Sequence, residues 1–476
     1  MGSYGRPRPA VQAGGDARGN RIGLGQNTEA LDYTALVPMW WIYQFLAALA
    51  LFVAGPWLLL LRRRHYLPTV RGRFGGGRPA AAAEPLPAGL WIHAVSVGES
   101  LLAGTLAARL PADLPLLLTT ITPTGQRQAA SLAARLGDRA QTAYLPFELG
   151  FALARFFRRF TPAAMVLVEG DYWPLLLRAV KRRGLPTAVV NGRVSDQSFP
   201  RLRLFRRLAL PLFFAPIDRF GVQTAVDAER LIALGVGPER ITVTGNLKFD
   251  SPEPPIQPEL ARRLERLADG RPILVAGSTM AGEEEQVLAA FRRLAGSGQA
   301  PGERALLVLA PRHPERFAAV AELVAAAHPD LVRRSGTDRA RPAVFLLDSI
   351  GELASTYRLA SAAFIGGTLR PTGGHNPIEA ARFGVPVAVG PSMTNFREIA
   401  DEFDRREAWG RVASGEDLGR LWDSWLTAPA RARAMGERGR ALVTANAGAL
   451  DRTLDLLAPL VAAAQTQQRR AGQTLR

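Results

Sequence analysis

The chain has 476 residues, which is enough for two or three domains. Hydrophobic residues make up 47% and charged residues 21%, the usual range for globular proteins, so a wholly disordered chain, a collagen and a coiled coil are excluded. Lys and Arg (59) exceed Asp and Glu (42) by 17, and the absence of Cys excludes disulfides, Cys-ligated metal sites and a thiol nucleophile. A net charge of +17 suits a nucleic acid, an anionic membrane surface or an anionic substrate.

The N-terminal end reads as an extension followed by a membrane segment. Residues 1–34 are rich in Gly, Arg and polar residues and are expected to be disordered. Residues 35–61 carry no charge and, as a helix, are long enough to cross a hydrocarbon core of about 30 Å. Trp40 and Trp57 near its ends and Arg62–Arg64 after it predict a single membrane anchor, with the rest of the chain on the cytoplasmic side. A buried or interfacial helix is the alternative, because two prolines and a glutamine interrupt the apolar run.

After residue 79, short apolar runs alternate with helical patterns in two series that a Pro-rich stretch separates. The runs expected to be buried parallel strands are 90–96, 114–122, 163–170 and 187–192, then 273–278, 305–311, 343–348, 362–367 and 385–390. We therefore predict an α/β protein with doubly wound domains at 80–250 and 260–445, a C-terminal helix at 446–464 and a disordered tail at 465–476.

Two acidic groups follow strands of the first series. Glu99 comes after the first strand, where it is either a general base facing a cleft or a carboxylate that stabilises a helix start. Glu169 and Asp171 follow a later strand, again with a helix-capping alternative. Because the carboxyl ends of parallel strands share one edge of a sheet, the two positions predict one acidic crevice.

The region 151–220 mixes arginines with Phe and Leu. It contains 13 basic and four acidic residues, and Phe156, Phe157 and Phe205 are interleaved with them. Such mixing suits an anionic lipid surface, single-stranded nucleic acid or a solvated helix face. The neighbouring apolar segment favours lipid, so we expect no nucleic-acid partner.

The second series carries a candidate phosphate site. Ser278 and Thr279 follow a strand, with helix capping as the main alternative, and Arg312 follows the next strand as a phosphate ligand. Gly351 and Glu352 stand at a further helix start. A Gly-rich turn then enters a helix at 375–379, where backbone N–H groups suit a phosphate and Glu379 suits ribose hydroxyls. The sequence has no Asp-x-Asp motif, so we expect protein groups to neutralise a leaving phosphate, with no metal or other cofactor.

In combination, these motifs resemble the 3-deoxy-D-manno-oct-2-ulosonic acid (Kdo) transferases of lipopolysaccharide assembly. They are HAVSVGE, TPTG, EGDYWP, NGRVS, TGNLKFD, GSTMAGEEE, PRHPERF, GEL and GGHNPIEA, in this order from the apolar segment to about residue 460. The resemblance implies a glycosyltransferase B-type fold of two Rossmann-like domains. It also implies CMP-Kdo as donor, a lipid A precursor (lipid IVA) as acceptor, and inverting transfer of Kdo without a metal or a covalent intermediate.

The resemblance also implies roles for individual residues. Glu99 matches the proton acceptor, and Glu169 and Lys248 match residues that stabilise the transition state. Lys248 is one of only two lysines in the chain. The segments matching those that hold CMP are Pro311 and Arg312, Ile350, Gly351 and Glu352, and Asn376, Pro377, Ile378 and Glu379, with Ser278, Thr279 and His375 as weaker matches.

The chain departs from the family pattern at three places. Met280 stands where the family usually has His, Gly170 and Asp171 replace Thr and Glu, and NGRVS replaces NARLS.

Two other functions remain open at this point. A transferase of the same fold that uses a UDP-sugar would differ in its donor preference. A membrane-bound module that binds nucleic acid or anionic lipid would bind in a salt-sensitive way that survives Glu99→Ala.

Overall fold

The computed structural model describes residues 37–61, 63–75, 89–250, 257–294 and 301–474. They fall into two parts, one ending at Trp57 and the other beginning at Leu58, and each is considered by itself. The expected disordered extension, 1–34, lies outside the described residues.

The apolar segment near the N-terminus forms a helix. It is α1 (Val37–Leu61), and α2 (Arg63–Arg73) follows it. Within the described ranges, no helix has both the length and the apolar character needed to cross a membrane. The membrane crossing expected for residues 35–61 is therefore not supported.

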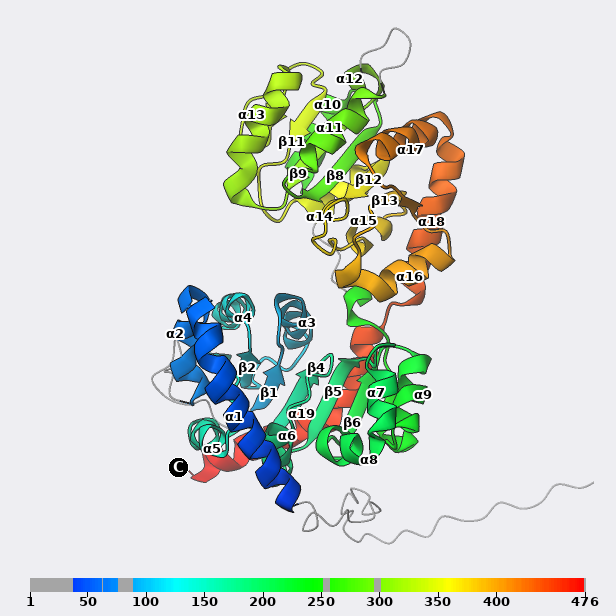
Figure 1. Cartoon of the computed structure of the whole chain (residues 1–476). Helices are drawn as coiled ribbons and strands as arrows, with labels where there is room; N and C mark the ends of the chain where they lie inside the picture. The colour runs from blue at the N-terminus through cyan, green and yellow to red at the C-terminus, as the bar shows by residue number, and fades with distance from the viewer. Residues whose placement is uncertain (1–36, 62, 76–88, 251–256, 295–300, 475–476) are drawn as a thin grey trace, which may run out of the picture. The chain divides into compact units, whose positions relative to one another are not determined.

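The first α/β domain contains a parallel sheet of seven strands among the described residues, in the order β3-β2-β1-β4-β5-β6-β7 (Figure 1). The strands are β1 (Leu90–His93), β2 (Leu116–Thr120), β3 (Ala140–Tyr144), β4 (Ala164–Val168), β5 (Thr187–Gly192), β6 (Arg219–Val222) and β7 (Ile241–Val243). Every residue of β1, β2, β4 and β5 is buried, which explains why these strands read as continuous apolar runs.

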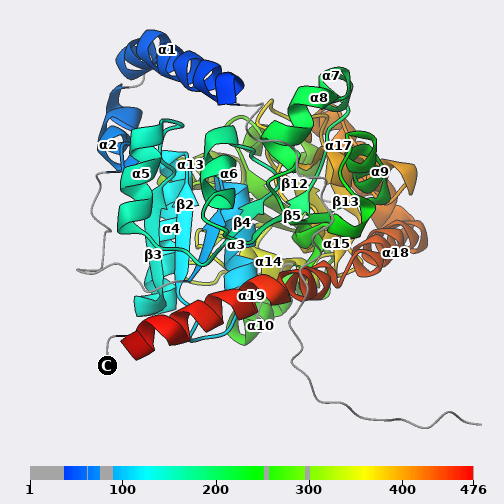
Figure 2. The same ribbon diagram turned by 90° about the horizontal axis from the view of Figure 1, so that it is seen from below.

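Helices connect these strands, and the C-terminal helix returns to the same domain. They are α3 (Val97–Ala107), α4 (Pro123–Leu136), α5 (Gly150–Arg159), α6 (Pro174–Lys181), α7 (Phe199–Leu204), α8 (Arg206–Ala209), α9 (Ala225–Ala233) and α19 (Ala449–Thr474). Figure 2 shows α19 as the long red helix beside this domain. Leu457 and Leu460 of α19 join the core formed by Leu90 and Ile92.

The tail expected to be disordered from residue 465 is helical as far as Thr474, so that prediction was wrong for these residues. The polar composition of the tail suggested disorder. However, the helix continues from a docked segment, and Gln468 Nε2 donates to the Asp113 carbonyl oxygen at 3.1 Å.

The second domain repeats the architecture, with the strand order β10-β11-β9-β8-β12-β13-β14. Its strands are β8 (Ile273–Thr279), β9 (Leu306–Pro311), β10 (Val332–Arg333), β11 (Val344–Leu346), β12 (Ala362–Ile365), β13 (Val387–Val389) and β14 (Gly410–Arg411). Its helices are α10 (Pro258–Ala268), α11 (Glu284–Arg292), α12 (Pro301–Arg304), α13 (Phe317–Ala327), α14 (Leu353–Thr356), α15 (Ile378–Ala381), α16 (Arg397–Arg405), α17 (Gly415–Thr427) and α18 (Pro429–Ala445).

Both sheets are doubly wound, which confirms the predicted pair of parallel α/β domains. In the first sheet the order of strands reverses between β1 and β4, and in the second between β8 and β12. Ligands of open parallel sheets bind outside the carboxyl ends of the strands at such a reversal. The loops after these four strands are therefore where a site is expected.

Candidate active site

One open pocket, with a volume of about 610 Å³, collects side chains that follow strands of both sheets. This volume is within the range of a typical ligand pocket, roughly 300–1,000 Å³. From the first domain it is lined by Ser96, Gly98, Glu99, Thr122, Thr124, Glu169, Arg193, Asn246 and Lys248, and from the second by Gly374, His375, Thr394, Asn395, Phe396, Arg397 and Ile399. The pocket thus brings together Glu99, Glu169 and Lys248, which the sequence placed on separate segments.

Glu99 is held at the start of α3 by two hydrogen bonds. Ser96 is the N-cap of this helix, and its hydroxyl donates to Glu99 Oε1 at 2.9 Å. The Val95 backbone N–H donates to Glu99 Oε2 at 2.6 Å. The Ser96 hydroxyl oxygen also accepts from the Glu99 backbone N–H at 3.5 Å, so Glu99 takes part in the start of this helix, as the helix-start interpretation expected. A carboxylate offers about four lone-pair positions, so each oxygen keeps capacity to accept a proton from the pocket.

Burial is the largest influence on Glu99 and raises the pKa of its carboxyl. The hydrogen bonds from Val95 and Ser96 lower this pKa, while the negative charge of Glu169 raises it and His93 lowers it. The net direction is upward. A carboxylate with a raised pKa is a stronger base, which is what general-base catalysis near neutral pH requires.

Glu169 and Lys248 form an ion pair beside Glu99. Lys248 Nζ lies 3.1 Å from Glu169 Oε1, and both side chains are about three-quarters buried. Asn191 Nδ2 also donates to Glu169 Oε1, at 3.3 Å. Glu169 has a φ of 65° and Asn191 a φ of 54°, in the left-handed region. Such backbone conformations cost of order 1 kcal/mol or more and persist only where the surroundings fix them.

Asp171 does not line the pocket. Its Oδ2 accepts a hydrogen bond of 2.5 Å from Trp173 Nε1 and lies 3.7 Å from Nε2 of the buried His93. Of the two acids predicted at this strand end, Glu169 therefore faces the pocket, whereas Asp171 fixes the turn before α6.

On the second domain, the positive charge of Arg312 acts on both His375 and Glu379. Burial, followed by the positive charges of Arg312 and His313, lowers the pKa of His375 to about 4. Burial raises the pKa of Glu379, against the opposing effects of Arg312, Arg382 and a hydrogen bond from Asn376. His375 is therefore neutral at physiological pH, and its buried Nε2 has no hydrogen-bond partner among the described residues.

The helix predicted after the Gly-rich turn is short. It is α15, which spans four residues, so it has little of the dipole that a longer helix would offer an anion. Asn376 Oδ1 already accepts from the Ile378 backbone N–H at 3.1 Å, and the Ile378 side chain is fully buried. Pro377 immediately precedes α15. An anion here would depend on Arg312 and on local N–H groups more than on a helix dipole.

The remaining predicted donor-side residues lie at the ends of β8, β9 and β11. Pro311 ends β9, and the Arg312 backbone N–H donates to the Thr279 carbonyl oxygen at 3.0 Å. Thr279 is buried and its hydroxyl donates to Glu284 at 2.9 Å, so its side chain has a structural role, while Ser278 has a φ of 56°. None of them is among the residues that line the pocket.

Glu352 is held in an ion pair. Burial would raise its pKa, but hydrogen bonds from Arg334 and Ser349 outweigh burial and lower it. Its neighbour Ile350 is 68% exposed, and Gly351 has a φ of 89°. The exposed turn at 350–351 therefore presents backbone and an apolar side chain, and Glu352 anchors it.

Sequence reasoning missed part of the lining. Arg193 belongs to a motif that was noticed without a role, and Thr394 to Ile399 were not considered. The missed loop follows β13 at the same edge of the sheet as the other site segments. Its position after a buried apolar run was the signal that could have identified it.

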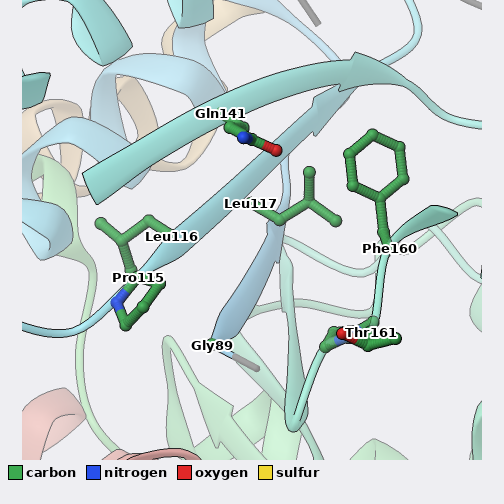
Figure 3. Close-up of a pocket in the computed structure, with 8 residues that line it drawn as sticks. Gly89, Pro115, Leu116, Leu117, Gln141, Phe160 and Thr161 are labelled. Carbon is green, nitrogen blue, oxygen red and sulfur yellow. The ribbon is translucent and has the colours of Figure 1, made fainter. Parts of the chain in front are cut away.

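Elsewhere, a small hollow with a volume of about 20 Å³ opens at the opposite, amino-terminal edge of the first sheet (Figure 3). Gly89, Pro115, Gln141 and Phe160 are among its lining residues, and none of that lining carries an ionisable side chain. In the part of the chain that the structure describes, no three His, Asp or Glu side chains are grouped to hold a metal ion.

The chain is similar to known proteins over most of its length. Residues 68–251 match the family described as 3-Deoxy-D-manno-octulosonic-acid transferase (kdotransferase). A 3-deoxy-D-manno-octulosonic acid transferase from Bordetella pertussis is 36% identical over 444 residues, which cover 91% of this chain and 99% of that protein. One from Haemophilus influenzae is 34% identical over 412 residues, covering 84% and 93%. Among solved structures, the C-terminal CMP-Kdo binding domain of WaaA from Acinetobacter baumannii is 31% identical, with a TM-score of 0.36, and covers 39% of this chain and 96% of that one.

Proposed function

Because the chain belongs to the 3-deoxy-D-manno-octulosonic acid transferase family, we propose that it moves Kdo from CMP-Kdo to the glucosamine disaccharide of a lipid A precursor. Membership confirms the resemblance found in the sequence and makes the protein a glycosyltransferase of lipopolysaccharide biosynthesis. The donor, the acceptor (lipid IVA) and the mechanism below are the proposal. The observation that carries it is the single pocket that holds Glu99, Glu169, Lys248 and His375.

In the proposed reaction, Glu99 accepts the proton of an acceptor hydroxyl. The hydroxyl oxygen forms a bond to C2 of Kdo as the bond from C2 to the phosphate oxygen breaks, and CMP leaves with that electron pair. Attack from the face opposite the leaving group inverts the anomeric centre. The raised pKa of Glu99 and its fixed position support this role.

The departing phosphate gains negative charge, which positive groups must stabilise. Lys248, Arg193 and Arg312 are the candidates, because the first two line the pocket and Arg312 influences His375 and Glu379. Glu169 holds the Lys248 ammonium in place. We propose that these groups replace a metal ion, in line with the family resemblance and with the missing Asp-x-Asp motif.

Because the acceptor is a lipid, we place the enzyme at the cytoplasmic face of the inner membrane and propose contact with anionic lipid through α7 and α8. Leu204, Phe205 and Leu208 are 76%, 59% and 50% exposed on these helices, beside the exposed Arg206 and Arg207. Apolar side chains flanked by arginines are typical of surfaces that rest on anionic membranes.

The test is transfer from CMP-Kdo to a tetra-acylated lipid A precursor in the presence of EDTA, with product masses and released CMP as the readouts. Wild type should transfer Kdo, and Glu99→Gln should lower kcat by about 10²–10⁴-fold, the contribution of a positioned base. Glu229→Gln, an exposed change on α9, is the matched control and should leave kcat unchanged. Transfer from a UDP-sugar but not from CMP-Kdo would overturn the proposed donor.

A further inference from the structure

We propose that three buried amide side chains, Asn191, Gln223 and Asn246, are positioning residues that hold the Lys248 ammonium against Glu169. Their exposed fractions are 0%, 6% and 7%, so each polar atom needs a partner within the protein. The proposed catalytic role of this pair rests on the transfer reaction above, whereas the positioning itself can be tested without that reaction.

Two of the amide side chains, Asn246 and Gln223, form a series of hydrogen bonds that runs in one direction. The Lys248 backbone N–H donates to Asn246 Oδ1 at 3.0 Å, and Asn246 Nδ2 donates to Gln223 Oε1 at 2.9 Å. Gln223 Nε2 then donates to the Asn191 carbonyl oxygen at 3.0 Å. A backbone N–H begins this series and a backbone carbonyl ends it, so the orientation of both amide groups is fixed. If the Asn246 or the Gln223 amide exchanged its oxygen and its NH₂ group, two donors would face each other.

Asn191 closes the network onto the ion pair. Its Oδ1 accepts from the Leu247 backbone N–H at 2.9 Å, which forces Nδ2 to face Glu169 Oε1. Lys248 Nζ contacts the same oxygen at 3.1 Å. The amides thus fix both ends of the pair, the lysine through the backbone of 246–248 and the carboxylate directly.

The chemistry explains why amides fill these positions. An amide both donates and accepts, so it can link backbone groups without adding charge beside Glu99, Glu169 and Lys248. A carboxylate at position 191 would place a second negative charge within about 3.3 Å of Glu169 Oε1. An apolar side chain at position 223 would leave the Asn246 amide and the Asn191 carbonyl without their partners.

Amine acylation reports on the pair directly, because the chain has only two lysines. Lys181 lies 2.7 Å from Asp218 and serves as the internal reference. The intact protein is treated with a trace of acetic anhydride, and peptide masses give the ratio of acetylation at Lys248 to that at Lys181. Gln223→Met keeps the side-chain length and removes both hydrogen bonds. It should raise the ratio about two- to fivefold, as expected for losing a weakly exposed ion pair.

A second variant, Asn191→Asp, should change the acetylation ratio in the opposite direction to Gln223→Met. It adds a negative charge beside the Lys248 ammonium and should lower the ratio. A general loosening of the fold would instead raise the ratio in both variants. Gln141→Met is the matched control. Gln141 is another buried amide, 4% exposed, and Figure 3 shows it beside the small hollow. It belongs to β3, at the other end of the strand order from β5, β6 and β7, and its variant should leave the ratio unchanged.

Transfer kinetics complete the test. Gln223→Met should lower kcat by about ten- to a hundredfold, the cost of misplacing a catalytic group, without changing KM for CMP-Kdo. An unchanged acetylation ratio in a folded Gln223→Met protein, or a rise in both variants, would overturn the positioning role. If the ratio changes as expected while wild type transfers no Kdo, the positioning role stands and the proposed reaction fails.

Discussion

Glu283→Gln should destabilise the second domain strongly, because this carboxylate organises the loop that leads to His375. Glu283 is fully buried and accepts four backbone hydrogen bonds. Oε2 accepts from Met280 and Gly367 at 2.9 and 2.7 Å. Oε1 accepts from Thr368 and Leu369, both at 2.9 Å. One side chain therefore ties the end of β8 to the loop after β12.

The magnitude follows from counting donors. A glutamine has one oxygen and one NH₂ group, so either orientation places the NH₂ against two backbone N–H groups. Leaving a buried donor without an acceptor costs about 1–3 kcal/mol, so two such donors cost about 2–6 kcal/mol. Rotating the amide cannot reduce this cost, because each carboxylate oxygen accepts two bonds. The expected loss is at the upper end of what single substitutions cause.

The assay is urea unfolding followed by tryptophan fluorescence, with Glu285→Gln as the control. Glu285 is the exposed neighbour in the same sequence, so it carries the same chemical change without the buried bonds. With a slope of about 2–3 kcal/mol per M, a loss of about 3 kcal/mol lowers the midpoint by about 1–1.5 M. Equal midpoints for Glu283→Gln and Glu285→Gln would refute the reasoning, since the two differ only in these hydrogen bonds.

Three further outcomes are expected. The proposed role of Glu99 as a base requires its ionised form, and the pKa of Glu99 is raised, so the acid-side midpoint of the pH–rate profile should lie above the pKa of an ordinary glutamate. Glu169→Gln removes one cause of the raised pKa, so this midpoint should move to lower pH. Arg316→Ala removes both hydrogen bonds to the fully buried Glu284 and should cost about 3–5 kcal/mol of unfolding free energy, less in an Arg316→Ala, Glu284→Gln double variant. By NMR, the His375 ring should not titrate between pH 5 and 8, because its pKa is lowered to about 4; a midpoint near 6.5 would contradict the burial seen here.

Strand ends were the part of the site that the sequence could predict. Buried parallel strands read as apolar runs, and a charged residue directly after such a run must lie at the carboxyl edge of the sheet. Glu99 and Glu169 follow from this reasoning without any structure. The reversal of strand order between β1 and β4 then brings the two carboxylates into one pocket.

The buried hydrogen-bond partners that hold the site residues in place could not be predicted in the same way. Asn191 and Asn246 are 55 positions apart in the sequence, and their connection depends on which strands become neighbours. Gln223 belongs to none of the sequence motifs, and the three glutamates after β8 (Glu283–Glu285) are of one residue type, so the sequence does not distinguish their roles. Only the structure shows that Glu283 faces the loop after β12, while Glu285 faces solvent. Periodicity identifies which side chains are buried, but it does not identify their partners.

The C-terminal segment, for which the sequence wrongly predicted disorder up to Thr474, shows the same limit of local sequence patterns. Its composition past residue 464 suggested disorder, because composition is a local property. Asp250, the last residue of the short 3-10 helix Leu247–Asp250, accepts from the Gly448 backbone N–H at 2.8 Å, and Arg452 donates to the Thr244 carbonyl oxygen at 2.8 Å. These contacts join the two places where the chain passes between the domains. Lys248 lies in one of them, in the same short helix as Asp250. A change in the angle between the domains would therefore move the segment that carries the lysine proposed to stabilise the leaving phosphate, which gives a reason for the proposed fixation of Lys248 by three buried amides.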